Sequence, residues 1–285
     1  MYQRMKLICC DVLFRMACRA AAVSKNIIDI EFTRLQSHVD PDLLRKEIQG
    51  LIDKADAEDV YEYILLGYGL CGNSTAGLTA RTRPLVIPRA HDCCTLFLGS
   101  REKFENNFSA RLSAQWSSHG YLERNHDYLG GTDLYKGLGM DKEYAELVEK
   151  YGEENAEYIW ETLHPAHNVG KDERIYIDVA PFDSPDDDHH FKRYEDAVAK
   201  EGVEGEEVKE GNESEESDIE SSSAKRTALD GIKAAGRPIT RLKGSTRLID
   251  LLLEGDWGDD FLIVQPGMSI AAVYDMEQVV SASAR

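Results

Sequence analysis

Cysteine, histidine and arginine side chains gather in two short motifs, and these are the residues of the chain best suited to chemistry. The first motif, Leu66–Asn73, reads LGYGLCGN and contains Cys71. The second, Pro88–Cys94, reads PRAHDCC and contains His91 and Cys93. Thiolates and imidazole suit zinc, iron and other borderline-soft metal ions. With a third cysteine near the N-terminus, they predict a metal site, zinc or iron, whose ligands are Cys10, Cys71, His91 and Cys93.

The second motif can supply two ligands only if its backbone is extended. Residues i and i+2 share a face in extended geometry, so His91 and Cys93 would point the same way. Asp92 would then point away from the metal and could orient one of the metal ligands without binding the metal itself. Each cysteine taken alone could instead be a small buried apolar residue, as free cysteines often are.

Two arginines and several glycines suggest a ligand other than a metal. Arg89 and Arg101 could clamp a carboxylate or phosphate, or could form structural salt bridges. The glycines after the expected strand Tyr63–Leu66 fit a dinucleotide fingerprint. This favours a nucleotide- or phosphate-binding protein as the alternative function. Only about a dozen residues separate this loop from the next strand, which leaves little room for a crossover helix. The residues of this ligand loop are Gly67, Gly69, Gly72 and Asn73.

A third hypothesis is nucleophilic catalysis by a thiol. Cys71 or Cys93 could act as the nucleophile of a hydrolase with His91 as its base. The sequence carries no signature of an oxyanion hole beside them, and whether the protein is an enzyme stays open.

Short apolar runs bounded by glycine and proline predict the buried strands of a parallel sheet. The expected strands are Lys6–Cys10, Ile27–Phe32, Tyr63–Leu66, Leu85–Ile87, Arg174–Val179, Pro238–Leu242 and Phe261–Val264. The expected helices are Val12–Val23, Pro41–Lys54, Arg101–Leu112, Met140–Leu163 with a break at Gly152, Phe191–Lys200 and Thr246–Glu254. The apolar residues after Cys94 are expected to form a turn into Gly99, and Gln115–Gly139 is expected to be an irregular segment near the site.

The alternation of strands and helices predicts an α/β fold with a mostly parallel sheet, helices on both faces and a Rossmann-like layered architecture. Ligands of such sheets bind past the carboxyl ends of the strands. Both motifs directly follow expected strands, so their side chains should meet at one edge of the sheet.

The charge and the N-terminus limit the partners and the location. The chain has 285 residues and a net charge of −19, which argues against nucleic acid and anionic membranes as partners. Asp11, Arg15 and Arg19 interrupt the apolar N-terminal stretch, which argues against a secretory signal, and no apolar run approaches the ~20 residues of a membrane span. We therefore expect a cytoplasmic protein.

Composition predicts three regions. Residues 1–183 should form the α/β core with the Cys/His site, and residues 237–285 should complete it with a strand, a helix and a strand. Residues 184–236 should be an acidic, largely disordered insert, because Glu201–Ser223 holds ten acidic residues against one lysine.

The two central motifs and several flanking segments resemble the domain of unknown function 1638 family of methanogenic archaea and anaerobic bacteria. The resemblance rests on Leu66–Asn73, Gly77–Leu78, Pro84–Cys93 and Leu98–Glu102, and extends to Cys10 and to most of the chain. Cys94 stands where the family usually has an apolar residue, so it is not counted as a ligand. The resemblance implies an association with corrinoid-dependent methyl-transfer proteins, and so with one-carbon or metal metabolism.

Overall fold

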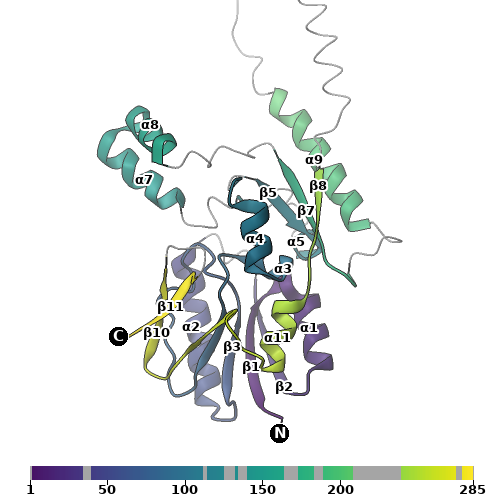
Figure 1. The fold of residues 1–285 in the computed structure, drawn as a ribbon, viewed down its shortest axis with the longest axis vertical. Coiled ribbons are helices and arrows are strands. Elements are labelled where there is room, and N and C mark those ends of the chain that lie inside the picture. Colours follow the sequence, from purple (N-terminus) through teal and green to yellow (C-terminus); the bar gives the residue numbers. More distant parts are fainter. Residues whose placement is uncertain are drawn as a thin grey trace, which may run out of the picture.

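The computed structural model describes residues 2–34, 40–111, 114–124, 132–133, 140–163, 173–182, 189–207, 239–273 and 278–284. It is a mixed α/β structure, as the sequence predicts, and its central sheet is mostly parallel (Figure 1). The strands divide between three sheets, however, and one of these sheets is a separate antiparallel pair.

The largest sheet has five strands in the order β2-β1-β3-β4-β9, and all but β9 run parallel. Its strands β1, β3 and β4 are buried on both faces, which explains their continuous apolar sequences. The bounds are β1 Arg4–Cys10, β2 Ile27–Thr33, β3 Tyr63–Gly67, β4 Leu85–Pro88 and β9 Phe261–Val264. Each was expected within a few residues of these limits.

Three helices pack against this sheet. The helix α1 (Phe14–Val23), which follows a short 3-10 turn at Asp11–Leu13, packs against β2 and α11 (Arg247–Glu254). The helix α2 (Pro41–Ala57) packs against β1 and β3. The Asp40 side chain accepts hydrogen bonds from the backbone N–H groups of Asp42 and Leu43, at 2.9 and 3.1 Å. This confirms the expected start of α2, with Asp40 as its cap and Pro41 in its first turn.

A second sheet stands beyond the first, in the order β6-β5-β7-β8. Its strands are β5 Gln115–Ser118, β6 Thr132–Asp133, β7 Arg174–Asp178 and β8 Ile239–Lys243, and β5, β7 and β8 run parallel. The expectation that Gln115–Gly139 is irregular is therefore wrong at its start. A search for apolar runs does not detect strand β5, because its sequence Gln115-Trp116-Ser117-Ser118 is short and mostly polar. Trp116 and both serines are nevertheless buried.

Two helices flank the second sheet. The short helix α5 (His119–Arg124) follows β5 directly, and α9 (His189–Glu207) packs against α5 and β7. A small apolar cluster of Leu122, Tyr176, Tyr194 and Val198 joins α9 to the sheet. The expected helix at Phe191–Lys200 is thus present and longer.

The segment after β4 is helical, which corrects the expected apolar turn. The helix α3 (Cys93–Leu98) begins after Asp92, whose side chain accepts from the Cys94 N–H at 2.9 Å, and ends at Gly99 with a φ of 74°. The next helix, α4 (Arg101–Phe108), is capped by Ser100 and is shorter than expected.

The remaining elements lie at the periphery. Gly152, with a φ of 79°, divides α7 (Met140–Tyr151) from α8 (Glu153–Leu163), as expected. The strands β10 (Met268–Ala272) and β11 (Val280–Ala284) form the separate antiparallel pair. Of the acidic insert, residues 184–188 and 208–236 lie outside the described part of the chain. Within that part, every helix is too short or too polar to cross a membrane.

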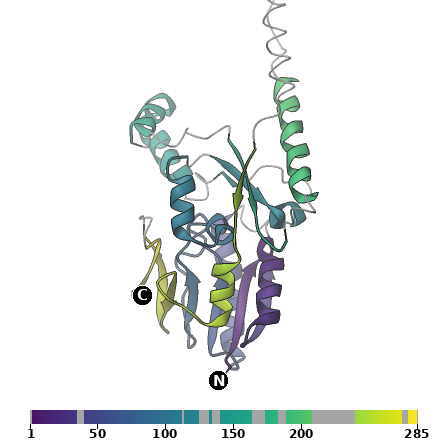
Figure 2. The same cartoon turned by 45° about the vertical axis from the view of Figure 1, so that its right-hand side comes forward.

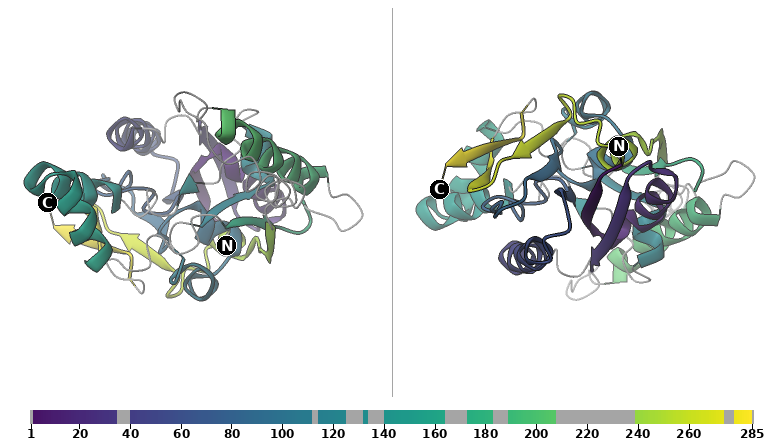
Figure 3. Two further views of the ribbon diagram at one scale, coloured as in Figure 1. Left: turned by 90° about the horizontal axis from the view of Figure 1, so that it is seen from above. Right: turned by 90° about the horizontal axis from the view of Figure 1, so that it is seen from below.

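The carboxyl ends of the parallel strands in the two large sheets point toward each other (Figures 1 and 2). Contact there is close: the Ser245 N–H donates to the Phe97 carbonyl at 2.9 Å, and a Cβ added to Gly120 would lie 1.9 Å from the Val12 carbonyl oxygen. One continuous buried core includes residues from both sheets, such as Leu7 and Trp116. Figure 3 shows the two sheets from above and below. Ligands of parallel sheets bind at the carboxyl ends of the strands, so we expect a functional site at this junction.

Candidate functional site

Three cysteine thiols meet at the junction, each from a different segment. Cys10 is the last residue of β1, Cys71 lies in the loop after β3, and Cys93 is the first residue of α3. The Cys93 thiol is hydrogen-bonded to the side chains of Cys10 and Cys71. Cys10 and Cys93 are buried, whereas Cys71 is half-buried. We call these three residues the thiol cluster.

The thiol cluster depends on a close approach of two loops. The backbone N–H groups of Leu70 and Cys71 donate to the carbonyls of Ala90 and His91, both at 2.8 Å. A Cβ on Gly69 would lie 2.7 Å from the Ala90 carbonyl oxygen, so only glycine permits this spacing. The glycine in the first motif therefore brings Cys71 beside Cys93.

The conformation of the first loop is unusual for its residue types. Cys71 and Asn73 have positive φ angles of 48° and 66°, and Gly72 between them has 61°. Non-glycine residues adopt this region infrequently, and such residues concentrate at functional sites. The Arg45 guanidinium helps to hold the loop by donating to the Asn73 carbonyl at 2.7 Å.

The local environment keeps the buried thiols protonated. Burial raises the pKa of Cys10. The hydrogen bond to Cys10 raises the pKa of Cys93 well above its usual value, and burial adds to this. A raised pKa disfavours a nucleophilic thiolate at these two positions, whereas a bound cation would displace the protons.

Tyr68 belongs to this environment, although it is not among the site residues predicted from the sequence. Its side chain is buried, and its hydroxyl lies 2.5 Å from the Thr33 hydroxyl. Burial raises the pKa of Tyr68 well above its usual value, and the neighbouring Cys10 raises it further. Its position between Gly67 and Gly69 was the available signal.

His91 and Asp92 are adjacent to the thiol cluster but are oriented by other groups. The His91 imidazole lies against the Phe104 ring, with centroids 5.4 Å apart. The Asp92 carboxylate caps α3, a role that the expected extended loop did not include. Burial raises the pKa of Asp92 to about 7, and its Oδ2 has no hydrogen-bond partner within the described residues. Cys94 is buried in the apolar core and takes no part in the cluster.

Arg89 and Arg101 hold the C-terminal part of the chain. The Arg89 guanidinium donates to the carbonyls of Gln278 and Val280. Arg101 donates to the Asp259 carbonyl at 3.2 Å and pairs with Asp260 at 3.6 Å. Arg101 thus forms the structural salt bridge given as the alternative, whereas these two contacts of Arg89 are to backbone carbonyls, and neither set of contacts supports an anion clamp.

The glycine loop lacks the geometry of a dinucleotide site. Such a site holds pyrophosphate at the N-terminus of a helix that follows the glycines. Here residues 68–84, all of them described, form turns and a single bridge and contain no helix. A Cβ on Gly67 would lie 2.5 Å from the Cys9 sulfur, so this glycine serves the packing of β3 on β1.

Comparison with known proteins identifies the family. A family model described as "Protein of unknown function (DUF1638)" matches residues 32–197, which is more than half of the chain. The chain belongs to this family. Searches of curated proteins and of solved structures found no match.

The DUF1638 match includes most of the site. Cys71, His91 and Cys93 lie inside the matched residues, as do Tyr68 and Asp92. Cys10 lies outside the match, which begins at residue 32. The structure thus links a thiol outside the DUF1638 match to two thiols inside it.

Proposed function

We propose that this protein binds a soft or borderline-soft metal ion, zinc or iron, through the thiol cluster. The observation that carries the proposal is the hydrogen-bonded chain of three thiols from three separate segments. Thiolates are the preferred ligands of such ions in proteins. His91 remains the predicted fourth ligand, because its loop is bonded to that of Cys71.

Thiol and imidazole groups are the kinds of donor that such a metal ion prefers, but the side chains are not spaced to hold an ion without rearrangement. No group of three or more His, Cys, Asp or Glu side chains in the described ranges is arranged to hold a metal ion. Side-chain rotation at Cys10, Cys71 and Cys93 would therefore accompany binding. Because the thiols must lose their protons, affinity should rise with pH.

The setting of the site forms part of the same proposal. We propose a cytoplasmic protein with Rossmann-like layering, its helices on both faces of the five-stranded sheet. Packing of α1 against α11, and of α2 against β1 and β3, supports this arrangement. A role in one-carbon or corrinoid-linked methyl transfer rests on the family resemblance alone. The site would serve either a catalyst or a metal carrier.

Metal analysis of protein purified without oxygen tests the proposal. We expect about one zinc or iron ion per chain in the native protein, and loss of most of it in Cys71→Ser and Cys93→Ser. Plasma emission spectrometry gives the content, and circular dichroism verifies that each variant is folded.

Cys18→Ser is the matched control, since Cys18 lies on α1 outside the thiol cluster. It should leave the metal content unchanged. If Cys71→Ser and Cys93→Ser retain as much metal as the control, the thiol cluster is not the ligand set. A nucleotide that raises the melting temperature when metals do not would favour the alternative function.

A further inference from the structure

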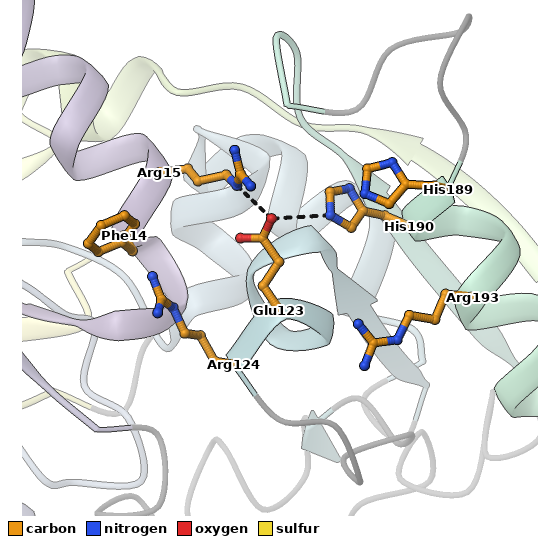
Figure 4. Close-up of a pocket in the computed structure, with 7 residues that line it drawn as sticks. All are labelled: Phe14, Arg15, Glu123, Arg124, His189, His190 and Arg193. Carbon is orange, nitrogen blue, oxygen red and sulfur yellow. Dashed lines mark hydrogen bonds and ion pairs between the residues drawn. The ribbon is translucent and has the colours of Figure 1, made fainter.

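A pocket lined by basic side chains lies between α1, α5 and α9 (Figure 4), and none of the thiols is among its lining residues. Its volume is about 510 Å³, within the usual range for small-molecule sites. Three arginines, two histidines, one phenylalanine and one glutamate line it. These are Phe14, Arg15, Glu123, Arg124, His189, His190 and Arg193.

The residues that line this pocket are more basic than the protein as a whole. Three guanidinium groups and one carboxylate line it, in a chain of net charge −19. Two helices also begin here, α1 at Phe14 and α9 at His189, and helix N-termini carry partial positive charge. The pocket is therefore electrostatically suited to an anion.

The single glutamate holds two of the basic groups in place. Its Oε1 accepts from the Arg15 Nε at 2.6 Å and lies 3.2 Å from the His190 Nε2. His190 is 4% exposed, so a buried polar side chain forms part of the wall. Figure 4 shows Glu123 between Arg15 and His190, as this bonding requires.

Arg124 is oriented without being neutralised. Its Nε donates to the Asp11 carbonyl at 3.1 Å, and its guanidinium carbon lies 4.4 Å from the centre of the Phe14 ring. Among the described residues, no carboxylate forms an ion pair with it. Its terminal nitrogens are thus positioned, with their charge, for a ligand in the pocket.

We propose that this pocket binds a small molecule that carries a phosphate group. A phosphate monoester has a charge of about −1.5 to −2 and three acceptor oxygens, which suit the guanidinium donors that line the pocket. The Phe14 ring supplies the apolar wall for the rest of the molecule. None of the residues involved belongs to the thiol cluster, so the proposal stands independently of metal binding.

Calorimetric titration of the full chain with inorganic phosphate and pyrophosphate tests this, with succinate as the carboxylate probe. We expect saturable phosphate and pyrophosphate binding at low ionic strength, weakened at least tenfold by Arg124→Gln and by Arg193→Gln, with succinate bound much more weakly. Arg19→Gln is the matched control, because Arg19 lies on the same helix α1 but pairs with Asp250 at 3.1 Å outside the pocket.

The effect of Glu123→Gln on binding distinguishes an anionic ligand from a cationic one. Loss of the carboxylate should strengthen phosphate binding severalfold, whereas a cationic ligand would need that carboxylate. Absence of saturable binding by the folded native chain, equal binding of succinate, or unchanged binding in both pocket variants would each overturn the proposal.

Discussion

At the scale of single residues, Glu31 joins two lysines from different elements. Its carboxylate lies 2.8 Å from the Lys6 Nζ and 3.2 Å from the Lys54 Nζ. The Lys6 side chain is only 10% exposed, so its charge depends on this partner. The hydrogen bond with Lys6 is the main cause that lowers the pKa of Glu31.

Replacement Glu31→Gln should make stability less dependent on pH. Because the folded pKa is lowered, the unfolded chain binds more protons below the ordinary Glu value of about 4.3, and the stabilisation disappears as pH falls through the folded pKa. We expect the variant to lose about 1 kcal/mol or more in unfolding free energy at pH 7, and the difference from the native protein to shrink at an acid pH below the folded pKa of Glu31. Urea unfolding at both pH values measures this.

Asp29→Asn provides the comparison, since Asp29 forms an exposed pair with Arg4 on the same two strands. Exposed pairs contribute little, so its effect should stay below about 0.5 kcal/mol. If Glu31→Gln and Asp29→Asn lose the same unfolding free energy at pH 7, the burial of Lys6 does not make its ion pair more stabilising than an exposed one.

Residue types predicted the thiols more successfully than their neighbours. Cysteines at or shortly after the ends of expected parallel strands should lie at one edge of the sheet, and Cys10, Cys71 and Cys93 meet there, while their role as metal ligands stays a prediction. The sequence could not indicate that Asp92 caps a helix, because the apolar run after it is too short to distinguish a helix from a turn. Arg89 and Arg101 have partners from residues 259–280, which local pattern cannot reveal.

At the scale of elements, the thiol cluster requires that two loops touch at Gly69. Gly69→Ala should force the first loop away from the second, because backbone atoms on the second loop leave no space for a methyl group. We expect a loss of about 1–3 kcal/mol in unfolding free energy and faster reaction of Cys93 with a thiol reagent. Urea unfolding and timed alkylation with mass spectrometry report these two effects.

Gly50→Ala is the contrasting substitution, since Gly50 lies inside α2 with nothing within 4 Å of an added Cβ. Helix propensity predicts that it stabilises the protein by up to about 1 kcal/mol. If Gly69→Ala is equally benign and Cys93 reacts no faster, the loops do not depend on that glycine.

Helices and strands could be predicted from the sequence where the apolar residues form a clear run or a regular spacing. The strands of the five-stranded sheet and the helices α2 and α11 follow from runs and periodic spacing of apolar residues. Strand β5 was missed because its buried positions include two serines. The pattern indicates that a strand is buried but not which strand pairs with it, so the division into two large sheets was out of reach.

At the scale of the whole molecule, the two large sheets meet where α5 begins. An added Cβ at Gly120 would collide with the backbone carbonyl of Val12, and backbone cannot move without shifting a sheet. Gly120→Ala should therefore cost about 3 kcal/mol or more and weaken the near-ultraviolet dichroism of Trp116, which packs beside Phe97 and Tyr121 at this junction.

Gly258→Ala serves as the reference, because an added Cβ there meets nothing within 4 Å. It should change the unfolding free energy by less than about 0.5 kcal/mol. Similar stability of the two variants, with the Trp116 signal intact in both, would show that the sheets do not need this contact.

The antiparallel strand β9 has a consequence for synthesis on the ribosome. It covers the open edge of β4, yet 172 residues lie between Pro88 and its partner Phe261. At ordinary translation speeds of 5–20 residues per second, the nascent chain exposes that apolar edge for about 9–35 s. An uncovered strand edge invites pairing with other chains, so this protein should need a chaperone most while residues 89–260 are emerging.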